Sequence, residues 1–227
     1  MSEATEVQAV RVWDLPTRTF HWLLAASVVA LVITGNVGGN ALVWHMRLGL
    51  LVGALLMFRI VWGLIGGRWS RFASFIFAPT TVLRYLRGDH RSGDHFDVGH
   101  NPLGSFSVFA LLAVLAVQVG TGLVADDEIA TTGPLNKFVT NAKGLLATSW
   151  HKDVGQWILI ALVVLHLGAI AFYRWRGVRL VRPMVTGDKQ LPADVPAATD
   201  STATRWAALV LAGLCAALAF WVGRLGG

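Results

Sequence analysis

Long apolar segments alternate with polar connections along most of the 227-residue chain. Five of these segments are long enough to cross the hydrocarbon core of a bilayer, for which a helix needs about 20 residues. They lie at about 20–36, 44–66, 103–125, 154–174 and 204–223. Irregular backbone cannot face lipid, because its N–H and C=O groups would lose their hydrogen bonds. Each segment is therefore predicted to be a transmembrane helix.

Three of the connections have patterns of their own. Residues 79–87 begin with a proline and place three apolar side chains on one face, which predicts a short interfacial helix. Residues 134–146 carry apolar side chains at helical spacing, which predicts an amphipathic helix lying over the mouth of the bundle. Residues 186–203, rich in Pro, Ala, Thr and Asp, are predicted to form a flexible linker.

The composition supports a membrane protein and restricts its chemistry. Hydrophobic residues make up 55% of the chain and charged residues 14%, whereas a soluble domain has about 25% charged residues. The single cysteine, Cys215, lies inside an apolar segment, so no disulfide framework or cysteine metal site is expected. The pair of cysteines followed by histidine that attaches a c-type heme is absent, so any heme would be bound noncovalently.

The net charge is +6, but its distribution argues against a nucleic-acid partner because the basic residues cluster just outside the apolar segments. Lys and Arg residues concentrate in the connections on the cytoplasmic side of bacterial membrane proteins. One side of the predicted bundle holds Arg11, Arg18, Arg68, Arg71, Arg84, Arg87, Arg91, Arg174, Arg176, Arg179, Arg182, Lys189 and Arg205. The other side holds Lys137, Lys143, Lys152 and Arg224. The N-terminus is therefore predicted to be cytoplasmic, with the first helix retained and not cleaved as a signal peptide.

Seven histidines divide into two groups by position. His90, His95 and His100 lie in a polar cytoplasmic connection and are predicted to be solvated. The other four lie at or inside predicted spans, where ionisable side chains are costly and face a functional interior: His21, His45, His151 and His166.

The predicted topology assigns a depth to each of the four. His21 begins a span that runs outward, so it lies near the cytoplasmic face, whereas His45 and His151 begin spans that run inward from the outer face. His166 lies fifteen residues after His151, about 22 Å deeper at 1.5 Å per residue. Two opposed imidazoles at one depth are what six-coordinate heme iron requires. The histidines therefore predict two bis-histidine heme b sites, His45–His151 on the outer side and His21–His166 on the cytoplasmic side.

Residues near these histidines are candidates for supporting roles. Arg59, buried in the second span on nearly the same face as His45, is expected near the inner heme, where it pairs with a propionate or instead snorkels to headgroups. Arg47 is a weaker candidate of the same kind near the outer heme. Three glycines on the helix faces of the histidines leave room either for a flat macrocycle or for close packing of another helix. They are Gly49, Gly53 and Gly155. Gln118 and Thr121 of the third span are expected either to line a pocket or to form hydrogen bonds with a neighbouring helix.

Several stretches resemble a known family. Residues 12–22 (VWDLPTRTFHW), 58–63 (FRIVWG) and 99–104 (GHNPLG), with Trp150-His151 followed by His166, are similar to bacterial cytochrome b561 proteins and to the b-type cytochrome subunit of nickel–iron hydrogenases. The resemblance covers about residues 10–185. It implies a four-helix core with bis-histidine heme ligation at the four positions. It also implies electron exchange between quinone and a partner such as a hydrogenase, a c-type cytochrome or another redox protein.

The predicted fold is an all-α membrane protein of the bacterial inner membrane. Its parts are a cytoplasmic tail (1–19), a four-helix diheme cytochrome b core (20–185), a linker (186–203) and a peripheral fifth transmembrane helix (204–223). The preferred function is electron transfer in a respiratory chain between quinone and a redox partner. The quinone is expected either near the inner heme, beside the first and second spans, or beneath residues 134–146.

Two other functions stay open at this point. One is a quinol-dependent oxidoreductase whose outer heme reacts directly with a small oxidant such as superoxide, which the lysines of the outer connections would attract. The other is a metal transporter, but such pathways add Asp, Glu, Cys or Met ligands within the spans. Here Met46, Met57 and Cys215 are the only such residues and they are scattered.

Overall fold

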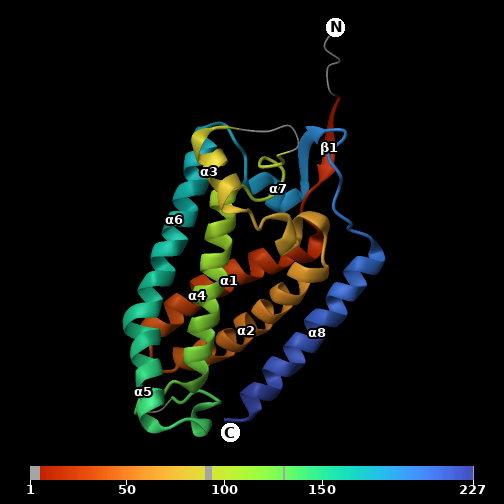
Figure 1. Ribbon diagram of the computed structural model, residues 1–227. Helices are drawn as coiled ribbons and strands as arrows, with labels where there is room; N and C mark the ends of the chain where they lie inside the picture. Colours follow the sequence, from red (N-terminus) through yellow and green to blue (C-terminus); the bar gives the residue numbers. More distant parts are fainter. Residues whose placement is uncertain (1–5, 90–93, 130, 227) are drawn as a thin grey trace. The chain divides into compact units, whose positions relative to one another are not determined.

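The computed structural model describes residues 6–89, 94–129 and 131–226 (Figure 1). Its helices and strands follow in chain order. They are β1 (Val7–Arg11), α1 (Leu15–Val37), α2 (Ala41–Ile65), η1 (Arg68–Ser70), η2 (Phe72–Ser74), α3 (Pro79–Arg87), α4 (Pro102–Val124), η3 (Asn136–Phe138), α5 (Asn141–Ser149), η4 (Trp150–Gly155), α6 (Gln156–Trp175), α7 (Val181–Thr186), β2 (Asp188–Pro192) and α8 (Thr202–Arg224).

Five helices in the described part of the chain are long and apolar enough to cross a membrane. Four are α1, α2, α4 and α8, and the fifth runs without a break through α5, η4 and α6 from Asn141 to Trp175. The prediction of a helical, multi-pass membrane protein is confirmed. The helix predicted at residues 79–87 also forms, as α3, and it ends where Gly88 adopts a φ of 74°. That conformation is readily available only to glycine.

The chain divides into two units, and each is described by itself. The first unit comprises Met1–Thr19, Ile60–Phe109 and His166–Ala208. Its centre is an antiparallel pair of strands in which Val7 of β1 lies opposite Pro192 of β2 and Arg11 lies opposite Asp188 (Figure 1). A small hydrophobic core packs beside the strands and consists of Val10, Val12, Trp13, Trp69, Val98, Leu191, Val195 and Ala198.

The segment predicted to be a flexible linker is ordered, and that prediction is wrong. Residues 186–203 contain β2 and supply three members of this core. Arg11 forms ion pairs with Asp188 (2.8 Å) and with Asp200 (3.1 Å), and Asp200 also pairs with Arg205 (2.9 Å). Burial alone would raise the pKa of Asp200, but the hydrogen bonds and charges of Arg205 and Arg11 lower it overall. The contacts of this segment are to residues far away in sequence, so its local composition did not reveal them.

A polar chain in the first unit joins α3, α4 and α6. Asn101 caps α4 by accepting from the backbone N–H of Gly104 (2.7 Å), and its amide donates to the Tyr173 hydroxyl (2.8 Å). Tyr173 in turn lies 3.2 Å from the hydroxyl of Tyr85. Burial and this hydrogen bond raise the pKa of Tyr85 to about 12, so it stays protonated at neutral pH.

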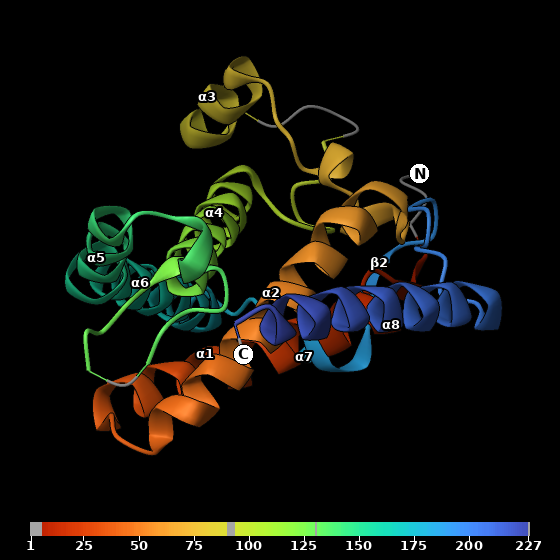
Figure 2. The ribbon, with the colours of Figure 1, turned by 90° about the horizontal axis from the view of Figure 1, so that it is seen from below.

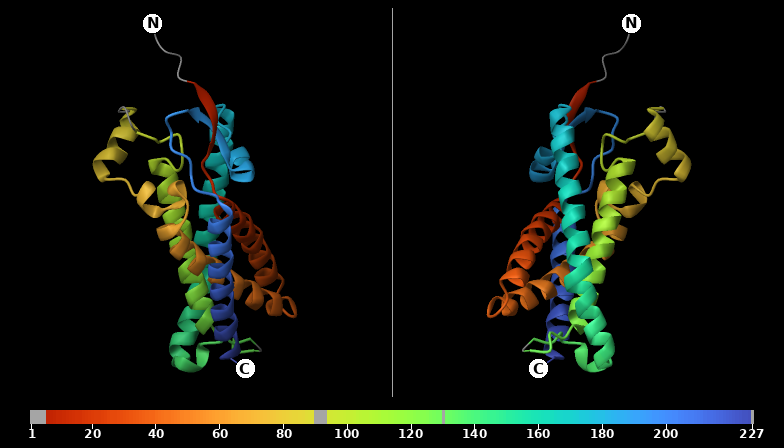
Figure 3. Two further views of the ribbon diagram at one scale, coloured as in Figure 1. Left: turned by 90° about the vertical axis from the view of Figure 1, so that its right-hand side faces the viewer. Right: turned by 90° about the vertical axis from the view of Figure 1, so that its left-hand side faces the viewer.

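The second unit comprises Phe20–Arg59, Ala110–Leu165 and Leu209–Gly227. A short connection with two glycines at positive φ, Gly38 and Gly39, reverses the chain between α1 and α2 (Figure 3). The helices of this unit pack around five buried side chains from four different helices, namely Val28, Val52, Leu56, Leu115 and Leu159. This apolar core holds the helix faces on which the outer pair of predicted ligands lies.

The amphipathic helix predicted at residues 134–146 does not form as expected. Residues 136–138 form a 3₁₀ turn, and α5 starts at Asn141 and continues into η4 and α6 (Figure 2). The Thr148 hydroxyl donates to the Asp126 carbonyl (2.9 Å), and the Asn136 side chain donates to the Val124 carbonyl (2.8 Å). The first bond holds α5 against the loop that follows α4, and the second holds η3 against the end of α4. At 1.5 Å per residue, the 35-residue helix is about 52 Å long, well beyond the hydrocarbon thickness of about 30 Å.

Candidate functional site: a pair of facing histidines

Two of the predicted ligands come together in the second unit. The ring centroids of His45, on α2, and His151, in η4, are 5.9 Å apart, and the ring planes are inclined at 82°. A metal–imidazole bond of about 2 Å places the centroids of two rings on opposite sides of one iron roughly 6 Å apart. The observed spacing therefore fits an axial pair.

Hydrogen bonds fix which nitrogen of each ring is available. His45 Nδ1 lies 3.0 Å from the carbonyl oxygen of Leu31, and His151 Nδ1 lies 2.9 Å from that of Gln118. A carbonyl only accepts, so each Nδ1 carries a proton and donates it. In a neutral imidazole the lone pair then resides on Nε2, so Nε2 is the nitrogen of each ring that is able to bind a metal. A histidine that binds a metal usually donates its other N–H in this way.

Both histidines line a largely apolar cavity between the helices of this unit. Its walls come from α1, α2, α4, η4 and α6 and from the residue Pro134. The lining residues are Leu31, Val32, His45, Met46, Gly49, Leu50, Val52, Leu115, Gln118, Val119, Gly122, Leu123, Pro134, His151, Gln156 and Leu159. Within the described residues, no group of three or more His, Cys, Asp or Glu side chains is placed to hold a metal ion. The two imidazoles would therefore need a ligand such as porphyrin to complete a metal's coordination.

The glycines singled out in the sequence differ in role. Gly49 lines the cavity, and a Cβ built there would meet no atom within 4 Å, so it leaves open space. A Cβ on Gly53 would touch Val119 at 3.4 Å, as expected for helix packing. A Cβ on Gly155 would collide with the side-chain oxygen of Gln118, so Gly155 allows α4 to approach η4 closely.

The two candidate arginines are separated by burial. Arg59 is only 3% exposed, so it does not snorkel to the lipid surface. The rings of Phe20 and Phe58 lie 6.4 Å apart, which brings the residues next to them, His21 and Arg59, to a similar level of α1 and α2. Arg47, by contrast, is exposed, lies 5.1 Å from the Trp44 ring and is not part of the cavity wall. The expectation that Arg47 lies by the outer heme is not supported by this geometry.

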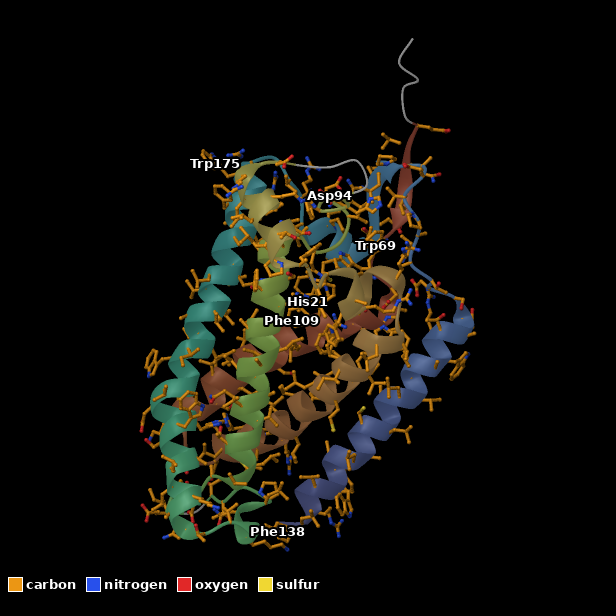
Figure 4. The ribbon with its side chains drawn as sticks, viewed as in Figure 1. His21, Trp69, Asp94, Phe109, Phe138 and Trp175 are labelled. Atoms are coloured by element: carbon orange, nitrogen blue, oxygen red, sulfur yellow. The ribbon has the colours of Figure 1, made fainter. Side chains whose placement is uncertain are left out.

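The predicted inner pair falls in two different units. His21 is half-buried on α1 in the second unit (Figure 4), with its ring 5.1 Å from that of Trp22. His166 is half-buried on α6 and begins the last segment of the first unit. Their pairing stays a prediction.

The loop histidines are less uniform than expected. His95 is exposed, in keeping with a solvated side chain, and His90 lies outside the described residues. His100 is half-buried between aromatic rings, with centroid distances of 4.9 Å to Trp13 and 4.5 Å to Phe75. It belongs to the packing of the first unit, and the expectation of a solvated His100 is wrong.

Sequence reasoning missed three features of this site. The carbonyls of Leu31 and Gln118 orient the two imidazoles, but a backbone acceptor has no signature in the sequence. Residues Trp150–Gly155 form a π-helix, a rare form that is frequent at functional sites. The fifth helix packs against one wall residue of the cavity, because a Cβ on Gly223 would lie 2.6 Å from the Leu50 side chain.

The sequence as a whole was compared with known proteins. Residues 12–187 match the family model described as prokaryotic cytochrome b561, a span that includes all four histidines. The chain belongs to the prokaryotic cytochrome b561 family. It is therefore a multi-pass membrane b-type cytochrome, and its chemistry is electron transfer. The fifth helix, α8, lies beyond the matched residues.

Curated relatives of this cytochrome carry related names. The probable Ni/Fe-hydrogenase 1 B-type cytochrome subunit of Escherichia coli K12 is 24% identical over 190 residues, which cover 69% of this chain and 80% of the relative. The probable Ni/Fe-hydrogenase B-type cytochrome subunit of Cupriavidus necator is 25% identical, covering 74% and 82%. That of Bradyrhizobium diazoefficiens is 23% identical, covering 80% and 86%. No solved structure matches the chain significantly.

Proposed function

We propose that this b-type cytochrome binds two hemes and transfers electrons between the membrane quinone pool and a redox partner. One heme would be held by His45 and His151 towards the outer face and the other by His21 and His166 towards the cytoplasm. Heme b supplies the one-electron redox change at each site. The observation that carries the proposal is the facing pair of imidazoles, 5.9 Å apart across an apolar cavity.

The contacts around the outer pair support ligation in particular. Both Nδ1 groups donate to carbonyl oxygens, which leaves both Nε2 lone pairs for iron. The wall is almost entirely hydrocarbon, and its polar members are Gln118, Gln156 and the histidines themselves. A flat apolar macrocycle is compatible with such a lining, and the low polarity would help to set its reduction potential.

The remaining parts of the proposal rest on the sequence. His21 and His166 are ionisable residues inside predicted spans, at one depth by the predicted topology. The excess of arginine and lysine on one side favours a cytoplasmic N-terminus in the bacterial inner membrane. The relatives named as hydrogenase subunits support a redox enzyme as the partner, and a quinone in the membrane would complete the electron path.

Heme stoichiometry tests the proposal. The purified protein should contain two hemes b per chain, measured from the reduced-minus-oxidised spectrum and the protein concentration. Replacement of His45 or His151 by alanine should remove the same single heme, and replacement of His21 or His166 should remove the other. His95→Ala is the control and should retain both hemes, because this exposed residue lies in a polar connection. A wild-type ratio near one, or loss of different hemes in His45→Ala and His151→Ala, would contradict the proposal.

Electron exchange with quinone needs a separate assay. The reduced protein in lipid vesicles should be reoxidised by a membrane-soluble quinone, and the oxidised protein should be reduced by the corresponding quinol. If neither reaction occurs with a protein that carries both hemes, the quinone part of the proposal is wrong. If oxygen or superoxide reoxidises the outer heme faster than any quinone does, the oxidoreductase alternative is correct instead.

A further inference from the structure

The second unit contains the same local arrangement twice, once at each facing histidine. The sequence Val-x-Thr-Gly occurs at residues 32–35 of α1 and at residues 119–122 of α4. The sequence Trp-His-x-x-x-Gly occurs at residues 44–49 and at residues 150–155. In the fold, the first copy of Val-x-Thr-Gly contacts His45 and the second contacts His151.

The glycine of each copy has an imidazole where its side chain would be. A Cβ built on Gly35 would lie 3.1 Å from both Nδ1 and Cε1 of His45. A Cβ built on Gly122 would lie 3.1 Å from Cε1 and 3.4 Å from Nδ1 of His151. Carbon atoms prefer separations of about 3.5–4.0 Å, so a methyl group at either position would push the ring away.

The carbonyl that accepts from each histidine lies four residues before the glycine. Leu31 precedes Gly35, and Gln118 precedes Gly122, by this spacing. In an α-helix the carbonyl of residue i already accepts the backbone N–H of residue i+4. Each of these carbonyls therefore already accepts the backbone N–H of the glycine. The imidazole reaches the same carbonyl by passing over the glycine, where no side chain is in the way.

The threonine of each copy lies beside the same carbonyl. The Thr34 hydroxyl donates to the Ala30 oxygen (2.7 Å) and lies 3.3 Å from the Leu31 oxygen. The Thr121 hydroxyl donates to the Val117 oxygen (2.8 Å) and lies 3.1 Å from the Gln118 oxygen and 3.3 Å from His151 Nδ1. A carbonyl that shares the threonine proton is a weaker acceptor for the imidazole N–H.

We propose that the two Thr-Gly pairs, Thr34-Gly35 and Thr121-Gly122, are positioning residues for the axial imidazoles of the outer heme. Each glycine lets its histidine reach the carbonyl and keeps the two ring planes near the observed 82°. Thr34 limits the strength of the hydrogen bond at Nδ1 of His45 and so raises the reduction potential, because a less basic imidazole stabilises the oxidised iron less. This inference rests on the proposed ligation by His45 and His151.

Electron paramagnetic resonance of the oxidised protein measures the ring geometry directly. Nearly perpendicular imidazoles give a highly anisotropic low-spin ferric signal, and this signal is expected for the outer heme of the wild type. Gly35→Ala and Gly122→Ala should each shift that signal or lose the outer heme, and should leave the signal of the inner heme unchanged. Gly120→Ala is the matched control, because it lies on the same helix as Gly122 with no atom within 4 Å of the added Cβ. It should give the wild-type spectrum.

A redox titration tests the threonines without adding bulk. Thr34→Val removes the hydroxyl at similar volume and should lower the midpoint potential of the outer heme alone. Thr34→Ser retains the hydroxyl and should restore the wild-type potential. If the glycine variants do not accumulate in the membrane, these two threonine variants still test the positioning role.

The outcomes separate the inference from the proposed function. If His45→Ala removes one heme but Gly35→Ala and Gly122→Ala give wild-type spectra, or if Thr34→Val leaves the potential unchanged, the positioning role is wrong and the ligation stands. If His45→Ala and His151→Ala retain both hemes, the proposed ligation itself fails.

Discussion

Asp14 is a charged side chain with no exposed surface, and four donors surround it. Its carboxylate accepts from the backbone N–H groups of Thr17 (2.7 Å) and Gly67 (3.0 Å), from the Ser70 hydroxyl (2.9 Å) and from the indole N–H of Trp62 (3.2 Å). It therefore caps the start of α1 and ties it to the end of α2 and to η1. A buried carboxylate is tolerated only when its oxygens are satisfied in this way.

Removing this carboxylate should destabilise the first unit. Asp14→Ala leaves the four donors without their acceptor, and hydrogen bonds to a charged group contribute about 1.5–3 kcal/mol each. We expect the free energy of unfolding to fall by at least about 3 kcal/mol, measured by tryptophan fluorescence during denaturation in detergent. Asp194→Ala, at an exposed aspartate of the same unit, is the control. Equal stability of the two variants would contradict the structural role of Asp14.

Arg59 and Arg47 offer a matched pair for an electrostatic prediction. Arg59 is buried on α2, whereas Arg47 is exposed on the same helix against Trp44. A buried positive charge favours the reduced form of a nearby heme, because reduction adds an electron. Arg59→Gln should therefore lower the midpoint potential of the inner heme, and Arg47→Gln should leave both potentials within error. If a redox titration shows no shift of the midpoint potential for Arg59→Gln, Arg59 does not lie near a heme.

At the scale of elements, the π-helix η4 determines where His151 points. A π turn holds one more residue than an α turn. The residues before it are therefore rotated, relative to those after it, from the orientation that a regular α-helix of the same length would give them. Gly155 contributes, because without a Cβ it admits the side chain of Gln118 against this turn. The Gln118 side-chain amide then donates a hydrogen bond to the His151 carbonyl oxygen (3.0 Å), so this acceptor of the π turn has a partner.

Deleting one residue should have different effects in this turn and in the regular helix that follows it. Deletion of Lys152 removes the extra residue that the π turn accommodates, so the turn can close as α-helix and His151 keeps nearly its orientation relative to α6. Deletion of Trp157, in the regular α-helix, instead rotates His151 by about 100° relative to the residues that follow, since an α-helix has 3.6 residues per turn. The Lys152 deletion should therefore retain the outer heme and the Trp157 deletion should lose it, as measured by the heme-to-protein ratio. Loss of the outer heme from both variants, or from neither, would show that the π turn does not accommodate the extra residue.

At the scale of the whole molecule, the distribution of charge predicts how the chain lies in the membrane. The basic connections and the N-terminus should face the cytoplasm, and the connection between α4 and α5 should face outward. Ile129, in that connection, is 90% exposed and so is suited to labelling. Asp89, just after α3, is also exposed and belongs to the opposite side in the predicted topology.

Cysteine labelling tests this orientation. In a background in which Cys215 is replaced by alanine, Ile129→Cys should react with a membrane-impermeant maleimide in intact spheroplasts, and Asp89→Cys should react only after permeabilisation. Exposed thiols ionise readily in water, so protection reflects the membrane and not burial. The reverse pattern would place the N-terminus outside.

The sequence alone was sufficient for the features that depend on composition along one helix. The five spans were predictable because a bilayer demands about 20 apolar residues in succession. His45 and His151 could be paired because span direction fixes depth, and the structure places their rings 5.9 Å apart. Arg59 was identified as unusual for the same reason: a charge within an apolar run is costly.

Other features depend on which segments meet in space, and the tertiary structure alone decided them. β2 and the rest of residues 186–203 are ordered by contacts with β1 and Trp69. The local sequence of this segment does not predict these contacts. Arg47 and Arg59 look alike in sequence, and only packing exposes one and buries the other. The acceptors for His45 and His151 are backbone carbonyls on neighbouring helices. Every residue has a carbonyl, so only the close approach of helices at Gly35 and Gly122 selects the two that orient the imidazoles.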